Sequence, residues 1–163
     1  MVYRDFINWW STRRSGAFIA RVFSARVDPL LYRLTGGRLT SAGPQVIPQL
    51  VLTTVGRKSG KRRRVQLGCL KKNGSYYVVA SNFGRENHPG WSYNLTDCPE
   101  ASIQVGDRGV QVLATRLSDA DRDALWPELE DVVPQFATYR KQTIRSIRVF
   151  RMDPRADRGN GVR

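Results

Sequence analysis

The chain has 163 residues, of which 40% are hydrophobic and 10% aromatic. This composition excludes a wholly disordered chain, because so many apolar side chains can bury enough surface to offset the ordering entropy, and the length predicts one domain. Twenty-seven Lys and Arg against 14 Asp and Glu give a net charge of +13, which predicts an anionic partner: phosphate groups, nucleic acid or an anionic membrane surface.

The N-terminal segment is predicted to be helical. Apolar residues recur at helical spacing through residues 3–34, with interruptions near Gly16 and Pro29. Arginines divide these stripes, so no window reaches the roughly 18 apolar residues of a membrane span. We expect helices that pack on the rest of the domain; the alternative is peripheral membrane contact through Trp9 and Trp10. No signal peptide is recognised, which predicts a cytoplasmic protein, with membrane association as the open alternative.

After a stretch rich in Gly and Pro, the pattern changes to short β-type runs. Residues 49–55, 63–70 and 75–81 are predicted strands of an antiparallel meander. A loop joins the first two, and Asn73-Gly74 joins the second to the third, because both residues tolerate the positive φ of a type I′ turn.

The remaining elements alternate between loops, helices and a second hairpin. In chain order we expect a loop at 82–90, a helix at 91–97, strands at 101–105 and 110–116, a helix from Ser118 or Asp119 to Val133, a helix at 136–143 and a strand at 147–152. Six strands without alternating crossover helices predict an α+β fold, an antiparallel barrel with peripheral helices.

A basic loop is the sharpest local feature. Residues 56–61 read GRKSGK, and three arginines follow. Its glycines allow backbone amides to turn inward, Ser59 adds a hydroxyl, and the cations offer charge-assisted hydrogen bonds to phosphate. The spacing excludes a Walker loop, because the glycines stand one residue too close and Arg62 replaces the magnesium-binding Ser or Thr. The alternative is a solvated basic turn.

A second group of candidates follows the meander, at residues 81–84 and 88–95. A strand ends there and a loop turns into a helix, where a planar ligand could meet backbone amides and Trp91. A lone histidine such as His88 is more typical of a loop surface than of a catalyst, and Trp91 is equally a core candidate. With one histidine, and two cysteines outside any metal-ligand spacing, no metal site is expected.

Four runs together resemble a known family. LVLTTVGRKSGKRR (50–63), YYVVASNFG (76–84), HPGWSYNL (88–95) and DCPEASIQVG (97–106) are similar, in order and spacing, to the actinobacterial deazaflavin-dependent nitroreductases. The resemblance extends over about residues 30–154 and implies a split antiparallel β-barrel. With the helical periodicity of the N-terminal segment, we expect a helical segment at 1–40, a cofactor-binding barrel at 41–154 and a disordered tail at 155–163.

The resemblance implies an oxidoreductase that passes a hydride from reduced coenzyme F420 to a quinone, a nitroaromatic or an enone. The phosphate end of F420 would contact the basic loop, at Arg57, Lys58, Ser59, Gly60 and Arg63. The ring would contact Ser81, Asn82, Phe83, Gly84, His88, Pro89 and Trp91. This chain departs from the family where Asn82-Phe83 replaces the common Lys-Gly, and where Arg62 and Gln66 replace prolines. Arg85 is the candidate replacement for the lost lysine.

The acceptor is expected beside the helix that follows Pro134. Phe136 and Tyr139 resemble the family's substrate-facing aromatic residues; Tyr139 is the candidate proton donor or orienting hydroxyl, whereas Phe136 is equally a core candidate. Three alternatives stay open: an FMN-binding oxidoreductase on the same barrel, a non-catalytic cofactor carrier, and a nucleic-acid-binding protein, for which no recognised motif is present. The sequence does not predict the oligomeric state.

Overall fold

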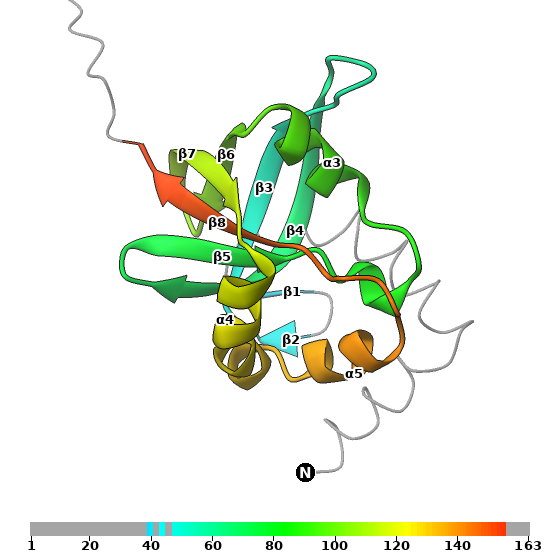
Figure 1. The fold of residues 1–163 in the computed structure, drawn as a ribbon. Coiled ribbons are helices and arrows are strands. Elements are labelled where there is room, and N and C mark those ends of the chain that lie inside the picture. Colours follow the sequence, from blue (N-terminus) through cyan, green and yellow to red (C-terminus); the bar gives the residue numbers. More distant parts are fainter. Residues whose placement is uncertain (1–38, 41–42, 45–46, 156–163) are drawn as a thin grey trace, which may run out of the picture. The chain divides into compact units, whose positions relative to one another are not determined.

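The computed structural model describes residues 39–40, 43–44 and 47–155 (Figure 1). The chain divides into two compact units, Met1–Gln45 and Val46–Arg163. In the first, the described strands β1 (Leu39–Thr40) and β2 (Gly43–Pro44) pair antiparallel. The predicted N-terminal helices with their membrane contact, and the tail beyond Arg155, lie outside the described residues.

The second unit is an antiparallel barrel whose strands close in the order β3-β4-β5-β8-β7-β6. Their bounds are β3 (Gln49–Val55), β4 (Arg62–Lys72), β5 (Ser75–Val79), β6 (Glu100–Val105), β7 (Arg108–Arg116) and β8 (Val149–Pro154). Strand β3 closes the ring, because Leu52 pairs with Val65 of β4 and with Ile103 of β6. The predicted α+β split barrel and its meander are confirmed.

The end of β5 and the start of β8 differ from the prediction. The Asn73-Gly74 turn has the expected positive φ angles of 51° and 80°. Strand β5 ends at Val79 and not at residue 81, and the carbonyls of Ala80 and Ser81 accept hydrogen bonds from the Arg145 side chain. Strand β8 begins two residues later than predicted; Ile147 instead packs outside the barrel, against helices.

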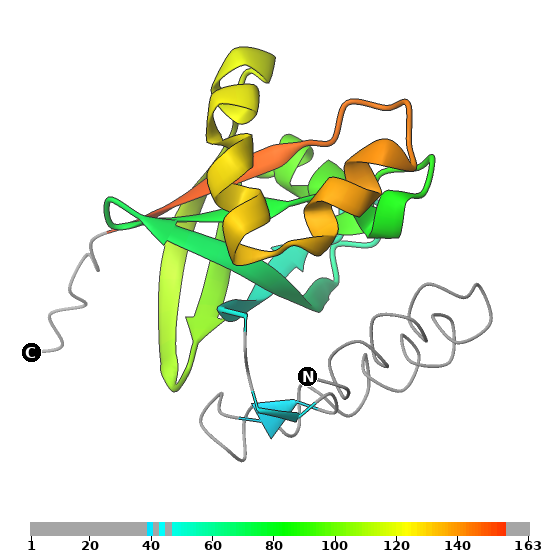
Figure 2. The same cartoon turned by 90° about the horizontal axis from the view of Figure 1, so that it is seen from below.

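Three α-helices and one 3-10 turn complete the described part of this unit. They are η1 (Asn82–Gly84), α3 (Gly90–Asp97), α4 (Asp119–Val132) and α5 (Gln135–Lys141). Ser118 caps α4, as expected, by accepting a hydrogen bond from the Asp121 backbone N–H at 3.1 Å. Helices α4 and α5 lie together on one side of the barrel (Figure 2). No described helix is long and apolar enough to cross a membrane.

Two hydrophobic cores attach these helices to opposite surfaces of the sheet. Inside the barrel, Trp91 and Leu95 of α3 pack with strand residues such as Leu52 and Phe150. Outside it, α4 and α5 bury Leu125, Trp126, Leu129 and Phe136 against strand residues that include Val79 and Val149. Burial of apolar surface stabilises a fold by about 25 cal/mol per Å², and this burial holds α3 inside the barrel and α4 and α5 outside it.

We predict that Gly84, at the end of η1 where it packs against the end of α5, tolerates no side chain. At its φ of +72°, an added Cβ would lie 2.5 Å from Gln142 Oε1 and 3.3 Å from the Tyr139 carbonyl oxygen. Gly74 has a similar φ of +80° with open space around it. Gly74→Ala should cost about 1 kcal/mol of unfolding free energy, from backbone strain alone, and Gly84→Ala about 2–4 kcal/mol. Urea denaturation measures both; equal losses would contradict a tight contact at Gly84.

Candidate functional site

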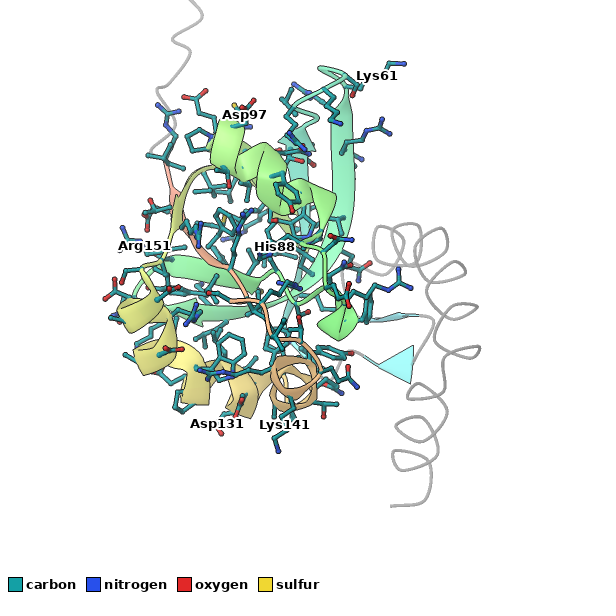
Figure 3. All side chains as sticks on the ribbon, turned by 45° about the vertical axis from the view of Figure 1, so that its right-hand side comes forward. Lys61, His88, Asp97, Asp131, Lys141 and Arg151 are labelled. Atoms are coloured by element: carbon teal, nitrogen blue, oxygen red, sulfur yellow. The ribbon has the colours of Figure 1, made fainter. Side chains whose placement is uncertain are left out.

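A cavity of about 460 Å³ opens between the β3–β4 loop and helix α3. Figure 3 marks its surroundings, with Lys61 at the tip of the loop and Asp97 at the end of α3. Loop and strand residues form one wall, and α3 forms the other. The lining residues are Gly56, Arg57, Lys58, Ser59, Arg63, Arg64, Val65, Gly90, Trp91, Tyr93 and Asn94.

The loop presents side chains, and few backbone amides, to this cavity. Gly56 donates its N–H to the Lys61 carbonyl, and Ser59 and Gly60 donate to the Gly56 carbonyl. The Arg57 and Lys61 amides are also bonded, to Asn94 Oδ1 and Ser59 Oγ. The prediction that the backbone amides turn inward was therefore wrong for five of the six loop residues, because the turn itself uses four of these donors and Asn94 of α3 accepts the fifth. A phosphate at this loop would be held mainly by side chains.

Asn94 connects the two walls. Its side-chain Oδ1 accepts the Arg57 N–H at 3.1 Å, and its Nδ2 donates to Thr54 Oγ1 at 3.0 Å. Thr54 and Asn94 are 2% and 8% exposed, so both bonds are shielded from water. A buried amide with two satisfied bonds has one favoured position, which fixes the loop relative to α3.

The cations of the loop have no anionic neighbour among the described residues. Arg57, Lys58, Arg63 and Arg64 are exposed, and none of them forms an ion pair in the described part of the chain. The Arg57 guanidinium lies 5.1 Å from the centre of the Tyr93 ring, a cation–π distance. Unpaired cations beside aromatic walls suit a ligand that combines a phosphate with a flat ring.

Arg145 holds the loop that precedes α3. Its Nη2 donates to the Ala80 and Ser81 carbonyls at 3.1 and 2.6 Å, and its Nε donates to the Arg85 carbonyl at 2.8 Å. Its Nη1 lies 2.9 Å from His88 Nδ1. One guanidinium thus ties both ends of the segment 80–88 to the chain before β8, a connection that no local sequence signal indicated.

His88 is neutral at physiological pH. Burial, reinforced by the positive charges of Arg148, Arg145 and Arg116, lowers its pKa to about 4. Since Arg145 can only donate, His88 Nδ1 accepts, and the ring proton sits on Nε2. His88 is therefore a fixed neutral group that also contacts the Tyr93 ring edge-on at 5.9 Å.

The predicted acceptor residues lie away from the cavity. Phe83 and Tyr139 pack edge to face, with ring centroids 5.9 Å apart, and Phe83 is 54% exposed with a φ of 57°. Phe136 is 7% exposed and belongs to the outer core. In Figure 3, Lys141 at the end of α5 lies at the opposite end of the molecule from Lys61, with His88 between them.

The structure thus brings only some predicted site residues to the cavity. Arg57, Lys58, Ser59, Arg63 and Trp91 line it; Gly60, Ser81, Asn82, Phe83, Gly84, His88, Pro89, Phe136 and Tyr139 do not. The sequence analysis included Asn94 and Tyr93 in the group of candidates at 88–95 but assigned neither of them a role. Asn94 was recognisable, since it follows Trp91 by three residues, a helical spacing that places both on one face.

Both cysteines are free thiols. Cys69 is buried in the barrel, and this burial raises its pKa to about 12, so the thiol is not ionised at neutral pH. The described residues contain no group of three or more His, Cys, Asp and Glu placed to hold a metal ion.

Comparisons with known proteins identify relatives over most of the chain. A family model described as F420H(2)-dependent quinone reductase matches residues 24–154. An F420H(2)-dependent quinone reductase of Mycobacterium tuberculosis is 32% identical over 146 residues, which cover 88% of this chain and 95% of the relative. A solved F420-H2 dependent reductase is 36% identical with a TM-score of 0.60, covering 68% of this chain and 100% of that one. A structure described as a domain-swapped dimer is 32% identical with a TM-score of 0.62, over 77% and 95% of the two chains.

We predict that His88 makes the protein less stable in acid. Its pKa lies below the ordinary 6.5, so between pH 6.5 and about 4 the unfolded chain binds the proton more strongly. The stability due to neutral His88 is complete above this window and is lost as the pH falls through it. His88→Asn keeps an acceptor for Arg145 but does not titrate. Thermal unfolding of both proteins between about pH 7.5 and 4.5 should diverge in acid; parallel curves would exclude this role.

Proposed function

The chain belongs to the F420H(2)-dependent quinone reductase family, and from this premise we propose that it transfers a hydride from reduced F420 to a quinone. Membership makes the chain an F420-dependent reductase. The quinone is the acceptor favoured, since the family model and the mycobacterial relative both carry it in their descriptions. A nitroaromatic and an activated enone are the alternative acceptors, because each also takes a hydride at an electron-poor centre.

The observation that carries cofactor binding is the set of unpaired cations along the cavity. Arg57, Lys58 and Arg63 fit the phosphate of F420, and Trp91 offers a flat wall for the ring. Ser59 adds a hydroxyl donor. Because the Asn94 bonds fix the basic loop relative to α3, the residues that hold the phosphate and those that face the ring keep a constant separation.

When bound, F420 supplies the hydride from its own ring, so no protein nucleophile is required. The chain's residues then have two tasks, to hold the ring face toward the acceptor and to keep the acceptor within reach. We assign the first to the segment 81–91, which includes Gly84 and Pro89, with neutral His88 and Arg145 as its positioning residues.

We assign the acceptor side to Tyr139. Burial raises the pKa of its hydroxyl, so the phenol keeps its proton at neutral pH and can donate a hydrogen bond that orients the oxygen of a quinone. The exposed Phe83 ring beside it provides an apolar surface for a planar acceptor. Phe136, which lies in the outer core, is proposed only to support Tyr139 from one turn earlier on α5.

The basic loop is tested by replacing Lys58 and Arg63 together with alanine. Each charge-assisted bond to a phosphate is worth about 1.5–3 kcal/mol, so affinity for oxidised F420 should fall at least about tenfold. The melting temperature should change little, because both side chains are exposed and unpaired. Titration by cofactor fluorescence measures the affinity.

Arg108→Ala is the matched control for this experiment. The residue is an exposed arginine that begins β7, at the end of the barrel away from the loop, and it should bind F420 like the wild type. Unchanged affinity of the double variant would remove the loop from the cofactor site. Parallel titrations with FMN and duplex DNA separate the alternative ligands.

The acceptor side is tested by Tyr139→Phe. Loss of the hydroxyl should lower kcat with reduced F420 and a quinone by about tenfold or more, and leave F420 affinity unchanged, since the hydroxyl acts on the acceptor. Tyr76→Phe, in strand β5, is the control and should match the wild type. Equal turnover of Tyr139→Phe on an accepted quinone would withdraw this role, and binding without turnover of any acceptor would favour a cofactor carrier.

A further inference from the structure

Arg148, the residue before β8, has buried donors without acceptors. Its Nε and Nη1 atoms are out of contact with solvent and make no hydrogen bond to any residue that the structure describes. Its guanidinium carbon lies 4.9 Å from the centre of the Tyr93 ring. A cation–π contact satisfies the charge in part but accepts neither N–H group. Buried donors on a cation are costly when unpaired, so the arrangement indicates a missing acceptor, and an anion is the strongest one.

The position of Arg148 is set by the register of β8. The Ala80 N–H donates to the Arg148 carbonyl at 2.8 Å, which extends the β5–β8 pairing by one residue. Side chains alternate along a strand, so Arg148 lies on the same face as Phe150, whose ring packs inside the barrel against Trp91 at 5.8 Å. Arg148 therefore lies one step beyond Phe150, at the end of the barrel that α3 covers.

This end of the barrel adjoins the cavity through shared side chains. Tyr93 lines the cavity, and the centre of its ring lies 4.9 Å from the guanidinium carbon of Arg148 and 5.1 Å from that of Arg57. His88, labelled in Figure 3, contacts Tyr93 from the preceding loop. Arg148 is not itself a lining residue of the cavity, so an anion beside Tyr93 would lie at the edge of the ligand site, between Arg148 and the Arg57 end of the basic loop.

The surrounding positive charges also favour an anion beside Tyr93. Arg57, Arg145 and Arg148 form no ion pair among the described residues. Arg145 uses four of its five N–H donors on three carbonyls and His88, so it adds mainly its charge to this region. Arg148 supplies donors to the same region. Its planar fork matches a carboxylate or phosphate.

We propose that Arg148 is an oxyanion-binding residue, which with Arg57 holds a carboxylate or phosphate group of a ligand beside Tyr93. Two sources have this chemistry: the acidic tail of F420, and a free acidic molecule that enters the cavity. Only the first source rests on the proposed function.

The test compares Arg148→Met, Arg148→Lys and Arg151→Met in the full chain. Arg151 is the matched control, because it lies on β8 but is already paired with Asp153 at 2.9 Å. Methionine keeps an unbranched stem over Tyr93 and removes the unpaired donors, so Arg148→Met should fold at least as well as the wild type. Arg148→Lys keeps the positive charge but lacks the planar guanidinium that can donate two parallel hydrogen bonds.

Two probes distinguish the sources. The first is equilibrium binding of F420 and of the same deazaflavin lacking phosphate and tail, followed by fluorescence. The second is the rise in melting temperature caused by citrate over sodium chloride of equal ionic strength. If the cofactor tail is the ligand, Arg148→Met should weaken F420 binding by about 10-fold to 100-fold and leave the truncated deazaflavin unaffected, with Arg148→Lys between.

If a free acid is the ligand, Arg148→Met should bind F420 normally and lose the citrate effect that wild type and Arg151→Met retain. Wild-type behaviour of Arg148→Met with both probes would overturn the proposal. Failure of the wild-type protein to bind F420 would instead refute the proposed function, and the citrate measurement would still decide the role of Arg148.

Discussion

The buried side-chain amide of Asn94 is the constraint on which the site depends. It joins the end of β3, through Thr54, to the basic loop, through the Arg57 amide, while its own helix is held by Trp91 and Leu95 inside the barrel. A loop of exposed like charges would otherwise spread apart by repulsion. Because one amide with two bonds holds the loop backbone beside α3, a ligand meets a loop that needs little ordering.

Arg145 provides the second fixed point, and it does so with charge. Its hydrogen bonds to backbone carbonyls and His88 hold the segment 80–88 in one path, including the left-handed residues Asn82 and Phe83. Each such residue costs on the order of 1–2 kcal/mol. The surrounding bonds offset this strain, which leaves the Phe83 ring exposed against Tyr139.

Some of the protein's cations form ion pairs with carboxylates, and others do not. Arg122, Arg140, Arg151 and Arg155 form surface ion pairs with carboxylates. The arginines around Tyr93 and the cations of the basic loop form no ion pair among the described residues. Burial, reinforced by the charges of Arg148, Arg145 and Arg116, lowers the pKa of His88. A site arranged in this way favours ligands with more than one anionic group, and it attracts them over distances set by the ionic strength.

The sequence by itself determined the positions of the six strands along the chain, the Asn73-Gly74 turn, a helix start at Ser118 or Asp119 and the basic loop, because each is encoded within a few neighbouring residues. Its resemblance to F420-dependent enzymes rested on the same local runs. Tertiary structure alone decided that the loop's amides bond within the protein, that Arg145 and His88 meet across 57 residues, and that Arg148 comes to lie over Tyr93. These contacts depend on barrel closure and strand register, which bring together residues that no local pattern relates.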